Sequence, residues 1–251
     1  MSDLEASKRA PRIEQHSLGQ SVALHLLPGI LTGVLFFAFT RPVRDLGFPS
    51  VAALILAGIV IIVPFEAGTI LYQAKRAGAK ALEEIILYRQ TGSVREYLIW
   101  VPVIFLSSGL IITALAPVTD YLQTLFAWLP KGFRLEMGLT ETYSKSKLIL
   151  TYSVYFVMIS LVIPTVEELY FRGYLLPRMP RLKGWAPVLH SALFALYHTW
   201  TPWMAFTRTL AVLPLIYIVR WKRNATLGII AHCLLNTIDV AVAVAFIVSM
   251  P

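Results

Sequence analysis

The amino-acid sequence predicts an all-α protein that crosses a membrane several times. Of its 251 residues, 57% are hydrophobic and 14% are charged, whereas about a quarter of a soluble domain is charged. A soluble fold of this length needs a polar surface that this composition cannot supply. The apolar residues also come in long runs without alternation, which favours helices over a transmembrane β-barrel.

Seven apolar runs define the expected spans. A helix needs roughly 20 apolar residues to cross the hydrocarbon core of a bilayer, and each run reaches or approaches that length. We therefore expect a transmembrane bundle of about seven spans, within a range of six to eight. The runs are residues 21–39, 50–72, 97–118, 147–166, 185–200, 203–219 and 226–248, of which the fifth is the shortest.

The chain divides into three parts. Residues 1–20 form a polar tail, residues 21–145 hold the N-terminal spans, and residues 146–251 hold the later spans with their polar motifs. Between the third and fourth runs, apolar residues recur at helical spacing in 121–130. This spacing is typical of a helix lying in the membrane interface, and a loop packed on the bundle fits it equally well.

Lysine and arginine set the expected orientation. The tail and the loops at 73–96, 178–184 and 220–225 hold 14 of them, against 6 in the opposite loops at 40–49 and 119–147. The richer side should be cytoplasmic, which places the N-terminus inside and the C-terminus outside. This topology accounts for the net charge of +8 without a nucleic-acid partner. The short loops favour a bacterial plasma membrane over the endoplasmic reticulum.

The first polar motif ends the fourth run. Ionisable side chains inside a membrane are costly, so they are functional candidates. Glu168 and Arg172 are four residues apart and can pair on one helical face. Glu167 points roughly 100° away, so Arg172 neutralises it less and it suits a general base. Pro164 removes a backbone donor just upstream. A salt-bridge cluster at a helix end is the alternative.

Two further motifs lie on later runs. Phe194 and His198 share the fifth run, and His232 and Asn236 project from one face of the seventh. Taken singly, each histidine is equally consistent with hydrogen bonding between helices. Asp239 lies near the His232 face and is a candidate to orient that ring. His190 is interpreted as a supporting or structural residue.

Together the three motifs describe a hydrolytic site. Glu167 with a histidine would activate a water, and His232 and Asn236 would donate to the oxyanion formed on a scissile carbonyl. The same atoms offer a second possibility, a divalent metal such as zinc held by Glu167, His198 and His232. The sequence leaves both open.

The ordered set Glu-Glu-x-x-x-Arg, Phe-x-x-x-His and His-x-x-x-Asn resembles the CAAX protease and bacteriocin-processing family of intramembrane proteases, also called type II CAAX prenyl proteases. The resemblance covers about residues 148–247. It implies hydrolysis of a peptide bond in a membrane-associated polypeptide, such as a prenylated C-terminus or a leader peptide, in a polar cavity open to the cytoplasm. The family roles fall on Glu167 and His198 for the water and on His232 and Asn236 for the oxyanion. Glu168 and Arg172 would support them.

Other functions stay open beside the protease. The family includes proteins named for bacteriocin immunity, which would act by binding, and a small transporter could use the same groups to relay protons. No internal repeat supports the transporter. The protease also makes a structural demand. The fourth span must continue through the motif to about Leu176, so that Glu167 lies within the membrane rather than at its surface.

Overall fold

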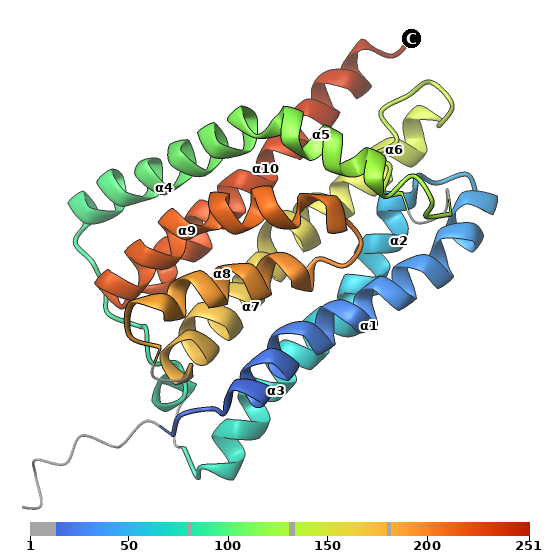
Figure 1. The fold of residues 1–251 in the computed structure, drawn as a ribbon. Coiled ribbons are helices and arrows are strands. Elements are labelled where there is room, and N and C mark those ends of the chain that lie inside the picture. Colours follow the sequence, from blue (N-terminus) through green and yellow to red (C-terminus); the bar gives the residue numbers. More distant parts are fainter. Residues whose placement is uncertain (1–13, 80–81, 131–133, 180–181) are drawn as a thin grey trace, which may run out of the picture.

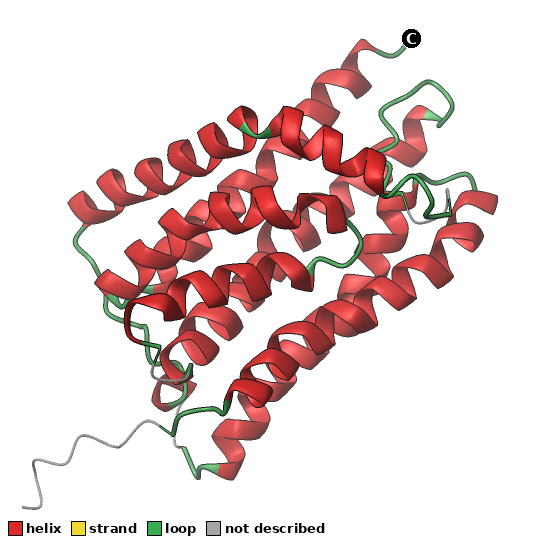
Figure 2. Ribbon diagram, in the orientation of Figure 1, coloured by secondary structure: helices red, strands yellow, loops and turns green. Residues whose placement is uncertain are grey.

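The computed structural model describes residues 14–79, 82–130, 134–179 and 182–251. Within these ranges the chain forms helices and loops and no strand (Figure 2). The predicted all-α class is therefore confirmed. Part of the predicted polar tail, with the basic residues before position 13, lies outside the described residues.

The long helices are α1 (Leu18–Asp45), α4 (Val94–Ala114), α9 (Ala205–Lys222) and α10 (Ala225–Ser249). The second span combines α2 (Ser50–Ala57), η2 (Gly58–Ile62) and α3 (Val63–Arg76). The fourth combines α6 (Lys145–Tyr155), η5 (Phe156–Val162), α7 (Ile163–Glu167), η6 (Glu168–Leu175) and η7 (Leu176–Arg178). The shorter elements are η3 (Leu82–Glu84), α5 (Ala116–Leu125), η8 (Lys183–Trp185), α8 (Ala186–Tyr197) and η9 (Pro202–Met204).

Six helical segments in the described chain are long and apolar enough to cross a membrane, with 21 to 34 residues each. The protein is therefore a multi-pass integral membrane protein. The fifth predicted run is the exception. It forms α8, a helix of 12 residues, about 18 Å long at 1.5 Å per residue. The count of six long helices lies at the lower end of the predicted range.

Side-chain caps fix where two of the spans begin. Ser17 precedes α1, and its hydroxyl accepts from the Gln20 amide while the Gln20 side chain accepts from the Ser17 amide. Ser93 and Glu96 repeat this capping box at α4. Each box satisfies two backbone donors that a helix start leaves free. These caps lie at or before the first residues of the predicted apolar runs.

The fourth span runs through the first motif, as the protease interpretation requires. Helix is continuous from Lys145 to Arg178, so Glu167 lies well inside it. Two wide π-helical segments, η5 and η6, stand on either side of α7. Pro164 is in the first turn of α7, where it lacks the amide that would continue the preceding helix. π-helical turns often occur at functional sites.

The helices pack side by side as one bundle (Figure 1). The start of α1 and the C-terminus lie at opposite ends. In the figure α8 and α9 run side by side, as their extensive packing also indicates. Helix α5 begins at Ala116 and ends at Leu125, so it overlaps the first half of the segment 121–130, and none of its residues is buried.

Candidate active site

The first motif forms a buried ion pair. Glu168 Oε1 lies 3.1 Å from Arg172 Nη1, and both side chains are fully buried. This is the pairing that the spacing of four residues predicts. A charge buried alone in a membrane is costly, and a partner at contact distance offsets part of that cost. The pair therefore holds both side chains in one place on η6.

The second motif packs against this pair. The Arg172 guanidinium stacks over the Phe194 ring, 4.0 Å from its centroid, which is a favourable cation–π distance. The Phe194 carbonyl accepts a hydrogen bond from His198 Nδ1 at 2.9 Å. Since a carbonyl can only accept, Nδ1 carries a proton, and Nε2 of the neutral ring is left as an acceptor.

Glu168 orients His232. His232 Nδ1 donates to Glu168 Oε1 at 3.0 Å, and Nε2 lies 3.9 Å from Glu167 Oε2. The sequence had suggested Asp239 for this role, but Asp239 accepts a hydrogen bond from the Tyr155 hydroxyl at 2.8 Å instead. An offset of seven residues turns Asp239 roughly 20° from His232 but about 10 Å further along α10, too far for contact.

The side-chain amide of Asn236 makes a hydrogen bond to the backbone. Its Nδ2 donates to the Ile159 carbonyl of η5 at 2.9 Å. An amide nitrogen has two hydrogens, so one remains for a ligand. Ser160, the next residue of η5, donates to the Asn236 carbonyl at 3.2 Å. The π-helical segment η5 thus holds Asn236 of the third motif in place, and it also precedes the first motif along the chain.

A glycine allows α10 to approach the ion pair. Gly228 lies one turn before His232, and a Cβ built there would overlap the Glu168 carboxylate and lie 3.2 Å from Val219 Cγ2. Only a residue without a side chain leaves room for Glu168 at this point. The short contact between Glu168 and His232 therefore depends on Gly228.

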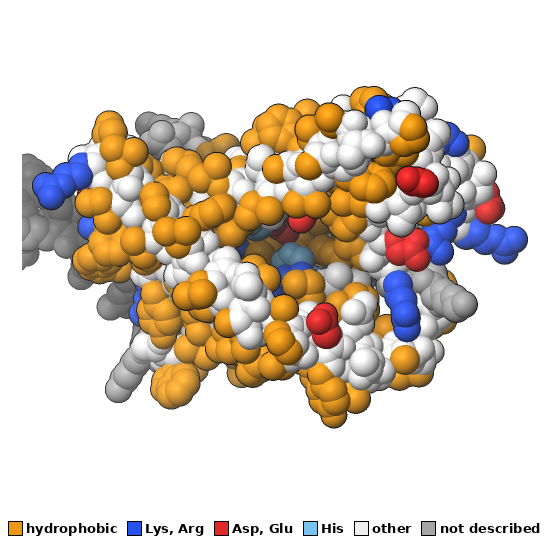
Figure 3. Space-filling view, turned by 90° about the horizontal axis from the view of Figure 1, so that it is seen from above, with side chains coloured by type: hydrophobic (Ala, Val, Ile, Leu, Met, Phe, Trp, Pro, Cys, Tyr) orange, Lys and Arg blue, Asp and Glu red, His pale blue; other side chains and the backbone are white. Residues whose placement is uncertain are grey.

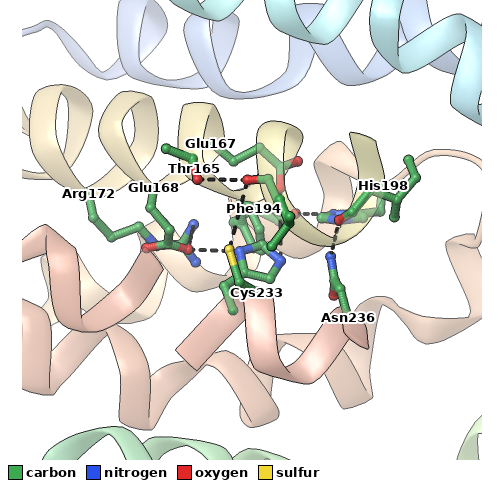
Figure 4. A network of polar contacts seen from close by, with 11 residues as sticks. Thr165, Glu167, Glu168, Arg172, Phe194, His198, Cys233 and Asn236 are labelled. Carbon is green, nitrogen blue, oxygen red and sulfur yellow. Dashed lines mark hydrogen bonds and ion pairs between the residues drawn. The ribbon is translucent and has the colours of Figure 1, made fainter. Parts of the chain in front are cut away.

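The three motifs come together from three helices. Figure 4 shows the labelled side chains of the fourth span facing Phe194 from α8, His198 from the turn after α8, and Asn236 from α10. The site is nearly closed, since the exposed fraction is 4% for the Glu167 side chain and 14% for His232. In Figure 3 the surface has a hollow with acidic, basic and histidine side chains inside a mostly hydrophobic rim.

The predicted metal set does not fit a metal as it is arranged. Among the described residues, no three His, Cys, Asp or Glu side chains converge as a metal site requires, and this includes Glu167, His198 and His232.

The structure adds a carboxylate that the motif analysis missed. Glu66 of α3 is fully buried, and neither of its oxygens has a hydrogen bond of good geometry to a described residue. Glu167 and Arg172 lie within electrostatic reach of Glu66, and the buried Tyr197 hydroxyl lies close to both Glu66 and Glu167. An acidic residue inside the second apolar run was the available signal, by the same reasoning that selected Glu167.

Two more ionisable residues lie inside predicted apolar runs, and this position marks them as functional candidates in the same way. Arg208 lies on α9 within electrostatic reach of Glu167 and His198. His25 of α1 lies with its Nε2 2.9 Å from His190 Nδ1, and both rings are fully buried. His190 therefore joins α8 to α1, which agrees with its interpretation as a structural residue.

Fold and site together define a multi-pass membrane protein with a buried cluster of Glu, Arg, His and Asn side chains. Residues 149–238 match the family model described as type II CAAX prenyl endopeptidase Rce1-like. The chain thus carries an Rce1-like domain of the CAAX protease and bacteriocin-processing family, which confirms the resemblance. All seven motif residues fall inside the match. No curated protein and no solved structure matches the chain.

Proposed function

We propose that the protein is an intramembrane endopeptidase that uses Glu167 and His198 to activate water. The observation that carries the proposal is the orientation of the His232 ring. Its Nδ1 is held by Glu168, and its Nε2 lies toward Glu167, 3.9 Å from Oε2. A structural salt bridge between Glu168 and Arg172 needs no such ring. Family membership of residues 149–238 supports the same reaction.

The chemistry follows from the atoms that remain available. Glu167 removes a proton from a water, and the hydroxide adds to the scissile carbonyl carbon. His198 Nε2, left as an acceptor by the bond from Nδ1 to Phe194, helps to position that water. The tetrahedral intermediate then collapses, the C–N bond breaks, and the proton held by Glu167 passes to the leaving amine.

His232 and Asn236 are the proposed donors to the oxyanion. Asn236 offers the amide hydrogen that Ile159 does not use. His232 donates to Glu168 from Nδ1, so donation from Nε2 requires the doubly protonated ring. Carboxylates stand on both sides of that ring, at 3.0 Å and 3.9 Å, and are placed to accept from it.

The substrate class follows from the surroundings of the site. A site within the helical bundle is reached by chains that are themselves at the membrane, so the proposed substrate is a membrane-associated polypeptide, with a prenylated C-terminus or a leader peptide as the first candidates. We also propose that the substrate reaches the site from the cytoplasmic side.

Cleavage of a quenched peptide library by the protein in liposomes tests the proposal. The library includes prenylated Cys-a-a-X peptides, and each reaction is run with and without a chelator. Glu167→Gln and His198→Ala should each lower the rate by about 10² to 10⁴, the usual contribution of general acid–base catalysis. Glu141→Gln, in an exposed loop, is the matched control and should cleave like the wild type. Cleavage that survives Glu167→Gln would rule the mechanism out.

A further inference from the structure

Arg208 is a cation at the candidate active site without an acidic partner. It lies inside the span Pro202–Lys222, where an arginine is normally paired. No described carboxylate lies within ion-pair distance of it, whereas Arg172 has Glu168 at 3.1 Å. Its Nη1 is buried and has no hydrogen-bond partner among the described residues. One end of the guanidinium is therefore free to bind a ligand.

The other end of the guanidinium is fixed beside His198. Arg208 Nη2 donates to Thr201 Oγ1 at 3.1 Å, and Met204 Sδ lies 3.6 Å from the same nitrogen. The Thr201 amide in turn donates to the His198 carbonyl at 3.0 Å. This short chain of bonds ties Arg208 to the turn at the end of α8, and its charge acts on both His198 and Glu167. Arg208 is thus held within electrostatic reach of the groups that would activate water.

We propose that Arg208 binds a carboxylate of the peptide substrate. The inference rests on the proposed protease function and adds a feature of the substrate, a negative charge close to the scissile bond. A guanidinium presents paired N–H groups that match the two oxygens of a carboxylate. Such a carboxylate comes either from the C-terminus of a short released fragment or from an acidic side chain near the cut.

A simpler role for Arg208 makes a different prediction. If the charge of Arg208 only acted on Glu167, its removal would slow every substrate equally, with or without a carboxylate. Removal of a carboxylate-binding residue instead slows substrates that carry a carboxylate more than substrates that lack one. The two roles are therefore separated by pairs of peptides that differ in that group alone.

The first experiment measures binding without requiring cleavage. Glu167→Gln protein in nanodiscs is offered a peptide mixture, with and without prenylated cysteine, in which each sequence occurs as the free acid, as the C-terminal amide, and as the amide with a terminal Asp. Retained peptides are counted by mass spectrometry. Free acids should be enriched about tenfold over amides, the effect of one charge-assisted hydrogen bond. Enrichment of the Asp amides instead would assign the carboxylate to a side chain.

Variants connect this enrichment to Arg208. In the same background, Arg208→Gln should abolish the preference for carboxylates, and Arg208→Lys should keep part of it because the charge remains. Arg220→Gln, the same change further along α9, is the matched control and should leave the preference intact. Equal retention of acids and amides by the Glu167→Gln protein, or a preference that survives Arg208→Gln, overturns the proposal.

A second experiment measures kcat/KM for a cleaved peptide as acid and amide. Arg208→Gln should lower kcat/KM about tenfold more for the carboxylate form than for the neutral form. An equal loss for both forms overturns the proposal even though the protein is a protease. Conversely, consider a protein that binds carboxylate peptides in a way that depends on Arg208 and yet cleaves no peptide. That result supports carboxylate binding by Arg208 and contradicts the protease function.

Discussion

At the scale of single residues, the contact between Glu168 and His232 depends on the missing side chain of Gly228. Gly228→Ala would bring a Cβ into the Glu168 carboxylate, so we expect Glu168 to move away from His232 Nδ1. The His232 ring then loses its orientation, and cleavage should fall by about 10 to 100-fold, as for other residues that orient a functional histidine. The peptide assay measures this loss.

Gly68→Ala is the control for that substitution. Gly68 is also helical, on α3, and a Cβ there has no atom within 4 Å. It should retain wild-type cleavage, since alanine fits the helix and touches nothing. Wild-type cleavage by Gly228→Ala as well would contradict the proposed role of Glu168 in orienting His232.

Glu66 leads to a prediction about stability and activity together. It is a fully buried carboxylate without a well-formed hydrogen bond in the described chain, and it shares its surroundings with Glu167 and Glu168. Glu66→Gln replaces this acidic group, which lies close to two other carboxylates, by a neutral amide of similar size, so the midpoint of thermal unfolding in detergent should rise by a few degrees. Cleavage should fall, because stabilising a strained polar site commonly lowers its activity. A lower unfolding midpoint would contradict this account.

Spacing in the sequence revealed the parts of the site that lie on one helix. Glu168 and Arg172 are four residues apart and pair as predicted, because a single helical turn fixes their separation. Contacts between helices could not be predicted from spacing. Asp239 lies on nearly the same face of its helix as His232, but it accepts a hydrogen bond from Tyr155. Glu66 and Arg208 were visible as charges in apolar runs, yet only the folded bundle places them beside the motifs.

At the scale of whole elements, glycines bring α1 against the end of α8. A Cβ at Gly29 would overlap the Tyr197 carbonyl, and one at Gly33 would overlap the Thr199 hydroxyl. Thr199 also donates to the Gly29 carbonyl at 2.8 Å. Small residues of this kind let membrane helices approach closely. The position of the turn at His198 therefore depends on a helix outside the family match.

Gly29→Ala tests that dependence. Added volume in a packed interface costs about 1–3 kcal/mol, so the unfolding midpoint in detergent should fall, and cleavage should fall with it as the end of α8 is displaced. Gly19→Ala on the same helix is the control, because a Cβ at Gly19 meets no atom within 4 Å. A similar midpoint for both variants would show that the α1–α8 contact is not tightly packed.

At the scale of the whole molecule, the sequence predicted the class of fold better than the length of each helix. Composition and run length indicate membrane helices because the hydrocarbon core imposes both. The run at 185–200 met the composition test, but its helix stops at Tyr197. The turn that follows is held by its own bonds, including Thr201 to the His198 carbonyl. Hydropathy does not record such local bonds.

The status of α8 can be decided from the positions of the chain ends. α8 is about 18 Å long, shorter than the hydrocarbon core, yet it lies antiparallel to α9, and the start of α1 and the C-terminus are at opposite ends of the bundle (Figure 1). An odd number of passes produces that arrangement. With the distribution of Lys and Arg, we expect the N-terminus in the cytoplasm and the C-terminus outside.

Single cysteines measure this topology directly, because Cys233 is the chain's one cysteine. In a Cys233→Ser background, Pro251→Cys and Glu141→Cys should react with a membrane-impermeant maleimide on intact cells. Gln90→Cys, in the loop between the second and third spans, should react only after the cells are permeabilised. If Pro251→Cys behaved like Gln90→Cys, α8 would be a segment that enters and leaves on one side. The helices after it would then have the opposite orientation, and the proposed access to the site from the cytoplasm would have to be reconsidered with them.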